Sequence, residues 1–203
     1  MPAAELVVGA PAHGGHCVAR HEGRVVFVRH AIPGERVVAE FTETGADARF
    51  WRADAVEILE ASPDRVSHPW PEAGPGGVGG AELGHVSLPA QRRWKATVLA
   101  ESFERFAGRE FPGEVRAVPG APEGLRWRTR VTATAAADGR AAMHVHRSEE
   151  RRALEAMPLA TRAGEEALLA VRADAGAGIV VATGSRGEPV VLVDDVPRRG
   201  ARP

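Results

Sequence analysis

The stretch from Ser62 to Lys95 constrains the fold of this chain most, because its first part, residues 62–86, is dense in proline and glycine. Such composition disfavours both helix and central strand. A connection of this length is usually functional, held by special contacts, or disordered. We therefore expect residues 62–86 to be a linker between one domain over residues 1–61 and a second over 87–203.

Short β-rich runs separated by glycine or proline fill the first segment, from residue 5 to residue 59. Runs at this close spacing predict a small antiparallel β-barrel. Gly14, Gly15 and Gly23 fit turn positions with positive φ, and Pro33-Gly34 is typical of a turn between two strands.

The order of these pieces resembles a TRAM domain, an OB-like five-stranded barrel. The residues that match its pattern are Gly14, Gly15, Val18, Ala19, Arg20, Gly23, Phe27, Val28, Pro33, Gly34 and Glu35. The resemblance implies that a face and loops of the barrel hold RNA. Arg20, Arg29 and His13 are then candidate phosphate contacts, with ordinary surface positions as the alternative.

The linker resembles the cluster-binding loop of the bacterial SAM-dependent RNA (uracil-5-) methyltransferases that carry a TRAM domain. Residues 79–80, His85, Gln91 and Lys95 match that loop. In many members four cysteines of this region hold a [4Fe-4S] cluster, and the positions equivalent to them here are His68, Val78, Ala81 and Met157. Because such clusters need thiolate ligands, we expect no cluster, and no ligand spacing around the two histidines predicts another metal site.

Helix and strand patterns alternate after residue 87 and predict an antiparallel sheet with helices on one side. A first helix is expected between Ser87 and Gly108, with one buried face. That face comprises Trp94, Val98, Leu99, Phe103 and Phe106. The other predicted elements are a strand over 125–135, a turn at 138–139, a return strand over 141–147, a helix over 159–173 and a hairpin over 178–193. The predicted fold class is thus a small β-barrel followed by an α+β domain.

Positive charge gathers in residues 92–152, which carry a net charge of +5 in a chain of net charge -1. Strand alternation places Arg126, Arg128 and Arg130 on one face, and a two-residue turn places Arg147 opposite Arg130. Two like charges directly opposite each other destabilise a strand pair, so an anion that bridges Arg130 and Arg147 would explain their placement. The alternative is that the two side chains extend into water or pair with nearby glutamates. The family's use of this region favours RNA phosphate. The candidate RNA contacts are Arg126, Arg128, Arg130, Arg147, His144, Arg20, Arg29 and Lys95.

No catalytic residue can be assigned from the sequence. The single cysteine, Cys17, lies in the barrel and does not match the family's catalytic cysteine. No glycine-rich loop between a strand and a helix predicts a SAM-binding fold. We therefore expect the chain to correspond to the non-catalytic portion of the family, ending before any methyltransferase domain, with no cofactor of its own and no activity alone.

Three functions remain open from the sequence. The first is an RNA-binding TRAM protein that recognises tRNA or rRNA. The second is a recognition subunit, or a gene fragment, whose methyltransferase domain is a separate chain. The third is a structural remnant without a specific RNA partner. The single cysteine and the lack of a long apolar run predict a cytoplasmic protein that does not enter a membrane.

Overall fold

The computed structural model describes residues 2–45, 47–121 and 123–198, and its packing divides the chain into two compact units. The first unit contains residues 1–69, 73–76 and 80–116, and the second contains 70–72, 77–79 and 117–203. Within the described residues, no helix combines the length and apolar character needed to cross a bilayer.

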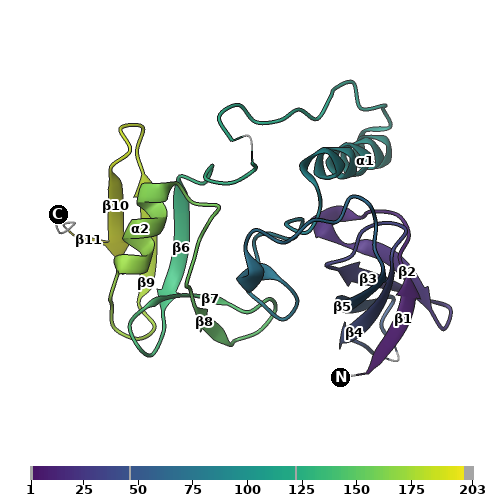
Figure 1. Cartoon of the computed structure of the whole chain (residues 1–203), viewed down its shortest axis with the longest axis horizontal. Coiled ribbons are helices and arrows are strands. Elements are labelled where there is room, and N and C mark those ends of the chain that lie inside the picture. Colours follow the sequence, from purple (N-terminus) through teal and green to yellow (C-terminus); the bar gives the residue numbers. More distant parts are fainter. Residues whose placement is uncertain (1, 46, 122, 199–203) are drawn as a thin grey trace. The chain divides into compact units, whose positions relative to one another are not determined.

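The first unit is built on a curved five-stranded sheet, coloured purple to dark blue in Figure 1. Its strands are β1 (Ala3–Val7), β2 (Cys17–His21), β3 (Arg24–Arg29), β4 (Arg36–Glu43) and β5 (Trp51–Glu60), in the order β1-β4-β5-β3-β2. Just after β1 the chain reaches the far edge of the sheet, where Gly9 N donates to Val18 O over 2.7 Å. The predicted β-rich first segment is confirmed, and its curvature fits the OB-like barrel. The expectation that the barrel is antiparallel is wrong at one pair of strands, because β3 and β5 run parallel, with Val26 beside Trp51.

Alternating burial explains why these strands form. Val26 and Val28 of β3 are fully buried in the core, whereas the intervening Phe27 is only partly buried. The β2–β3 hairpin turns through Glu22 and Gly23, both of which have positive φ. Gly23 was expected in such a conformation, since glycine adopts it without steric cost.

A buried carboxylate fixes the chain where the barrel ends. Glu35 is fully buried and accepts hydrogen bonds from the backbone N–H groups of Ile32 and Ser62. Both of its oxygens also accept from the Arg65 guanidinium, over 2.6 Å each. Burial alone would raise the pKa of Glu35, but these hydrogen bonds outweigh it and lower the pKa. The linker therefore begins at a defined, charge-paired point on the barrel.

The helix α1 (Leu88–Ala107) belongs to the first unit. Its bounds agree with the prediction, and Gly108 ends it at φ 59° with its N–H bonded to Glu104 O. Trp94 is buried and donates its indole N–H to Ala12 O over 3.2 Å. Val98 packs against the same core, but the predicted buried face is wrong at the other three positions, because Phe106 is 80% exposed and Leu99 and Phe103 are exposed as well. Only the first half of the helix meets the barrel core.

Residues 62–86 contain only a short 3-10 turn, η2 (Pro71–Ala73), as the proline and glycine content predicts. In the second unit, Trp70 is buried and donates its indole N–H to Glu72. The Glu72 carboxylate also accepts the backbone N–H groups of Glu155 and Ala156, over 3.0 and 3.2 Å. Packing thus assigns parts of the linker to each unit and places α1 with the barrel. The domain boundaries at 61/62 and 86/87 stay predictions.

The second unit is a six-stranded antiparallel sheet with the strand order β11-β10-β9-β6-β7-β8. Its strands are β6 (Arg130–Ala135), β7 (Ala141–His144), β8 (Arg151–Ala153), β9 (Gly178–Thr183), β10 (Pro189–Val193) and β11 (Val196–Arg198). The helix α2 (Arg162–Ala170) packs against β6, β9 and β10, as the green and yellow part of Figure 1 shows. The predicted antiparallel sheet is confirmed. The second predicted helix is shorter than expected at both ends, because Thr161 caps its start by accepting the N–H of Gly164 and Val171 is already extended after its last residue.

The hairpin between β6 and β7 differs from the prediction by one residue of register. Ala136 N donates to Arg140 O over 2.8 Å, so residues 137–139 form the loop, with Gly139 at φ 80°. Ala135 therefore pairs with Ala141. A glycine in the left-handed region closing a loop of this length is a common alternative to the two-residue turn.

Candidate nucleic-acid interface

The predicted row of arginines on one strand is broken. β6 begins only at Arg130, and Arg126 has a φ of 62°. Its guanidinium forms an ion pair with Glu165 of α2. Arg128 N donates to Leu159 O over 2.8 Å, so this part of the chain lies beside residues 158–161. The prediction that three arginines share a strand face is wrong, because the positive φ at Arg126 interrupts the alternation.

Trp127 is exposed and is paired with the half-buried Arg128. The indole is 52% exposed, and the Arg128 guanidinium lies over it, 5.2 Å from the ring centroid. Of the face expected to be buried, Val131 is buried and Trp127 is not. Arg130, at the start of β6, is exposed. An exposed indole with guanidinium groups beside it can stack on a base and contact phosphate.

The predicted facing pair of Arg130 and Arg147 does not form. The strand neighbour of Arg130 is Ala182 of β9, and β7 ends at His144. Arg147 lies in the following turn at φ 56°. His144 is exposed, and its Nδ1 lies 3.2 Å from Ser148 O. This prediction is wrong, because the longer hairpin loop shifts the register and the strand ends before Arg147.

Of the residues in the barrel that are candidate RNA phosphate contacts, Arg29 has a structural role. It is 7% exposed and donates to both oxygens of Asp54, over 2.8 and 2.6 Å. A buried guanidinium held in a bidentate pair by one carboxylate is fixed in place as part of the barrel, which favours a structural role over phosphate contact. Arg20 of β2, His13 of η1 (His13–Gly15) and Lys95 of α1 are exposed, and their RNA contacts stay predictions.

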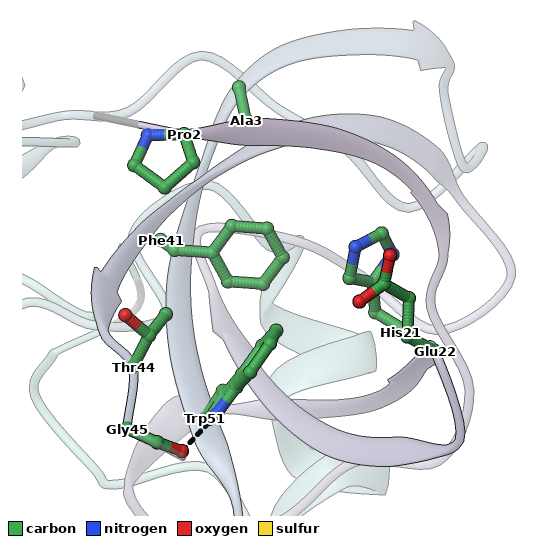
Figure 2. A pocket seen from close by; sticks show the side chains of 8 residues that line it. All are labelled: Pro2, Ala3, His21, Glu22, Phe41, Thr44, Gly45 and Trp51. Carbon is green, nitrogen blue, oxygen red and sulfur yellow. Dashed lines mark hydrogen bonds between the residues drawn. The ribbon is translucent and has the colours of Figure 1, made fainter.

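The barrel carries a pocket that sequence reasoning missed. Figure 2 shows its lining, which consists of Pro2, Ala3, His21, Glu22, Phe41, Thr44, Gly45 and Trp51 around a volume of about 340 Å³. The rings of Phe41 and Trp51 lie 5.4 Å apart with an interplanar angle of 83°. His21 lies 5.3 Å from Phe41 and 6.3 Å from Trp51, between ring centroids.

A hydrogen bond and a neighbouring arginine guanidinium hold the Trp51 ring of this aromatic group in place. Trp51 donates its indole N–H to Gly45 O over 3.1 Å, and the Arg24 guanidinium lies 5.3 Å from the Trp51 ring centroid. Next along the chain, the Arg52 guanidinium lies 4.8 Å from the ring centroid of Phe50. The two adjacent aromatic residues flanked by arginines over 49–52 are a sequence signal for this surface, whereas the contact with Phe41 depends on the fold.

The four positions that resemble cluster ligands do not fit an iron–sulfur cluster. Val78 and Ala81 carry no ligand atom, and Met157 is a fully buried thioether rather than a thiolate. The Nε2 atom of His68 lies 3.1 Å from Ala81 O within the first unit. In the described ranges, no group of three His, Cys, Asp or Glu side chains is placed to hold a metal ion.

Cys17 is not a nucleophile in this fold. It is fully buried, and its Sγ lies 3.4 Å from Ala31 O. Burial and the nearby Glu35 carboxylate raise the pKa of the thiol to about 12. Because the thiolate is the reactive form of cysteine, this environment suppresses attack on a substrate.

Residues 5–56 match the family model of the TRAM domain. The chain is 45% identical, over 98% of its own length and 48% of the relative, to an uncharacterized RNA methyltransferase of Streptomyces avermitilis. It is 40% identical, over 70% of its length and 30% of the relative, to the 23S rRNA (uracil(1939)-C(5))-methyltransferase RlmD of Halomonas elongata.

Among solved structures, the fold is similar to that of a Pyrococcus abyssi tRNA (uracil-54, C5)-methyltransferase in complex with S-adenosyl-L-homocysteine. The TM-score is 0.55 at 20% identity, over 96% of this chain and 47% of that one.

The barrel residues 5–56 thus match a TRAM domain. The chain is similar to curated RNA methyltransferases, and it spans about half the length of the curated relatives it matches first.

Proposed function

We propose that these residues form the RNA-recognition part of an RNA (uracil-5-) methyltransferase-like protein that acts on tRNA or rRNA. The observation that carries the proposal is the exposed Trp127 with the half-buried Arg128 guanidinium over its ring, followed by the exposed Arg130. Stacking and phosphate contact are the two interactions by which proteins bind single-stranded RNA without reading its sequence. The TRAM match and the RNA methyltransferase relatives support RNA as the ligand.

Methyl transfer is not assigned to these residues. Both described sheets lack the doubly wound parallel arrangement that binds SAM, and the buried Cys17 is the only thiol of the sequence. The relatives support SAM as the family's cofactor. We therefore assign recognition to this part of the fold and leave the chemistry to a catalytic domain, whichever chain carries it.

A [4Fe-4S] cluster is likewise not part of the proposal. With His68, Val78, Ala81 and Met157 at the positions of the family's cysteines, we expect no stoichiometric iron or sulfide after anaerobic purification. A visible charge-transfer band together with bound iron would contradict this assignment.

Fluorescence anisotropy with labelled single-stranded RNA and with tRNA and rRNA fragments tests the proposed function. We expect saturable binding whose affinity falls steeply with salt, because phosphate contacts release counterions. Absence of binding at low salt would contradict the proposal and favour the third alternative, a structural remnant without an RNA partner.

A further inference from the structure

We propose that the barrel pocket between Phe41 and Trp51 binds one unstacked nucleobase of single-stranded RNA, and that guanine is the preferred base. The inference deepens the proposed function and rests on it, because it assigns a base-recognition site to the same RNA-binding protein. The Trp127–Arg128 pair lies in the other compact unit, so the two sites can be tested independently.

The walls of the pocket suit a flat aromatic ligand. Phe41 is almost fully buried and fixed in the core, whereas Trp51 and His21 are partly exposed. Phe41 and Trp51 pack edge to face, and both line the pocket together with His21, as Figure 2 shows. A volume of about 340 Å³ lies at the small end of the range for ligand sites, as a single base requires.

The indole of Trp51 is fixed before any ligand arrives. Its N–H is already used by Gly45 O, and the Arg24 guanidinium lies beside its ring and donates to Ala48 O over 2.9 Å. A ring held in this way offers its surface for stacking at little cost in side-chain entropy.

The polar wall of the pocket is Glu22, which occupies an unfavourable backbone position. Glu22 has φ 48° and is the first residue of the two-residue turn between β2 and β3, where both central residues have positive φ. Such positions favour Asn, Asp or Gly, and a longer side chain there costs stability. Within the described ranges, no ion pair or hydrogen bond engages the Glu22 carboxylate. A strained, unpaired acid beside an aromatic pocket points to a ligand with N–H donors.

Guanine matches this carboxylate best among the four bases. A carboxylate has two acceptor oxygens, and the Watson–Crick edge of guanine presents two adjacent donors, N1–H and the N2 amino group. Adenine and cytosine present one amino group next to an acceptor nitrogen, and uracil presents one N–H between two carbonyls. Only guanine places donors against both oxygens of Glu22.

The first test compares labelled single-stranded U9 with a U9 variant that carries one central G, A or C, by fluorescence anisotropy on the whole chain. We expect the G-containing strand to bind about tenfold more tightly than U9, the scale of one bidentate base contact. The E22G variant should lose this preference and bind all strands as U9. Its melting temperature should equal or exceed that of the parent, because glycine suits the positive φ. Equal binding of all bases by the parent, or a guanine preference that persists in E22G, would overturn the assignment.

The second test separates failure of the pocket from failure of the proposed function. The Trp51 indole N–H signal, assigned with a W51F variant, is followed by ¹⁵N NMR during titration with GMP, AMP, CMP and UMP. A saturable shift with GMP that is weaker with the other nucleotides supports the pocket, even if no oligonucleotide binds. RNA binding without any GMP-induced shift at Trp51 would overturn the pocket while leaving the proposed function intact.

Discussion

The guanidinium of Arg128 lies over the indole ring of Trp127, 5.2 Å from its centroid, at a position where the indole is 52% exposed. A tryptophan that exposes so much apolar surface contributes little to the core. Its position beside Arg128, with Arg130 at the start of the next strand, gives the second unit a stacking surface bordered by positive charge.

Replacing Trp127 with Ala separates binding from stability. Because the side chain is half exposed, the free energy of unfolding should change by less than about 0.5 kcal/mol. Loss of one stacking platform should weaken single-stranded RNA binding by about 1–3 kcal/mol, measured by anisotropy. W127F should retain most of the affinity, and a W127A variant that binds RNA like the parent would argue against base stacking at this site.

Replacing Arg126 with Ala should have the opposite effect: it should lower stability and leave RNA affinity unchanged. Its guanidinium pairs with Glu165, whose other oxygen accepts the Met157 N–H over 2.7 Å. We expect the variant to be destabilised by about 1 kcal/mol in urea unfolding, because the pair is only partly buried. RNA affinity and its salt dependence should be unchanged in the folded variant, although one positive charge is lost. A reduced salt slope would place Arg126 at the RNA.

The Glu72 carboxylate should hold its part of the linker in place. It accepts the indole N–H of the buried Trp70 and the backbone N–H groups of Glu155 and Ala156. E72A leaves a buried donor unpaired, which costs about 1–3 kcal/mol of unfolding free energy. Hydrogen exchange at residues 155–156 should accelerate. The exposed Glu57 provides a control, since E57A should change neither quantity.

Acid should destabilise the first unit through two buried histidines. Burial lowers the pKa of His30 to about 3 and that of His85 to about 4. The folded chain therefore binds fewer protons than the unfolded chain below the ordinary histidine pKa of about 6.5. Stability is fully present above that pH and is lost as the pH falls toward 4.

Each unit of pKa shift corresponds to about 1.4 kcal/mol, so His85 alone accounts for roughly 3 kcal/mol of this loss. Melting temperature measured from pH 7.5 to 4.5 checks the prediction, and an H85Q variant should have a flatter profile. H144Q, at an exposed site, should follow the parent. A parent profile that is flat below pH 6.5 would show that these histidines are not buried.

Local signals in the sequence predicted the parts of the fold that depend on local chemistry. The turn residues Gly23 and Gly139 have positive φ, and α1 ends at Gly108 as expected. In contrast, β8 and β11 were missed, because Arg151–Ala153 and Val196–Arg198 are short and lack a buried, alternating pattern.

The wrong predictions at the candidate site have their causes in the backbone conformation. One positive φ at Arg126 broke a strand pattern that assumed unbroken alternation, and one extra loop residue before Arg140 moved Arg147 away from Arg130. The aromatic pocket could not be predicted from spacing, because Phe41 and Trp51 come from neighbouring strands whose register only the fold provides.

The salt dependence of RNA affinity tests the central claim most directly. Log affinity is measured against log salt for the parent, for R128A/R130A and for R20A/K95A, which removes the same charge from exposed positions of the first unit. We predict that R128A/R130A weakens binding to all RNA sequences and flattens the slope by roughly one to two units. R20A/K95A should have the smaller effect. If R20A/K95A abolishes binding while R128A/R130A leaves affinity and slope unchanged, the assignment of the main RNA contact to the second unit is wrong.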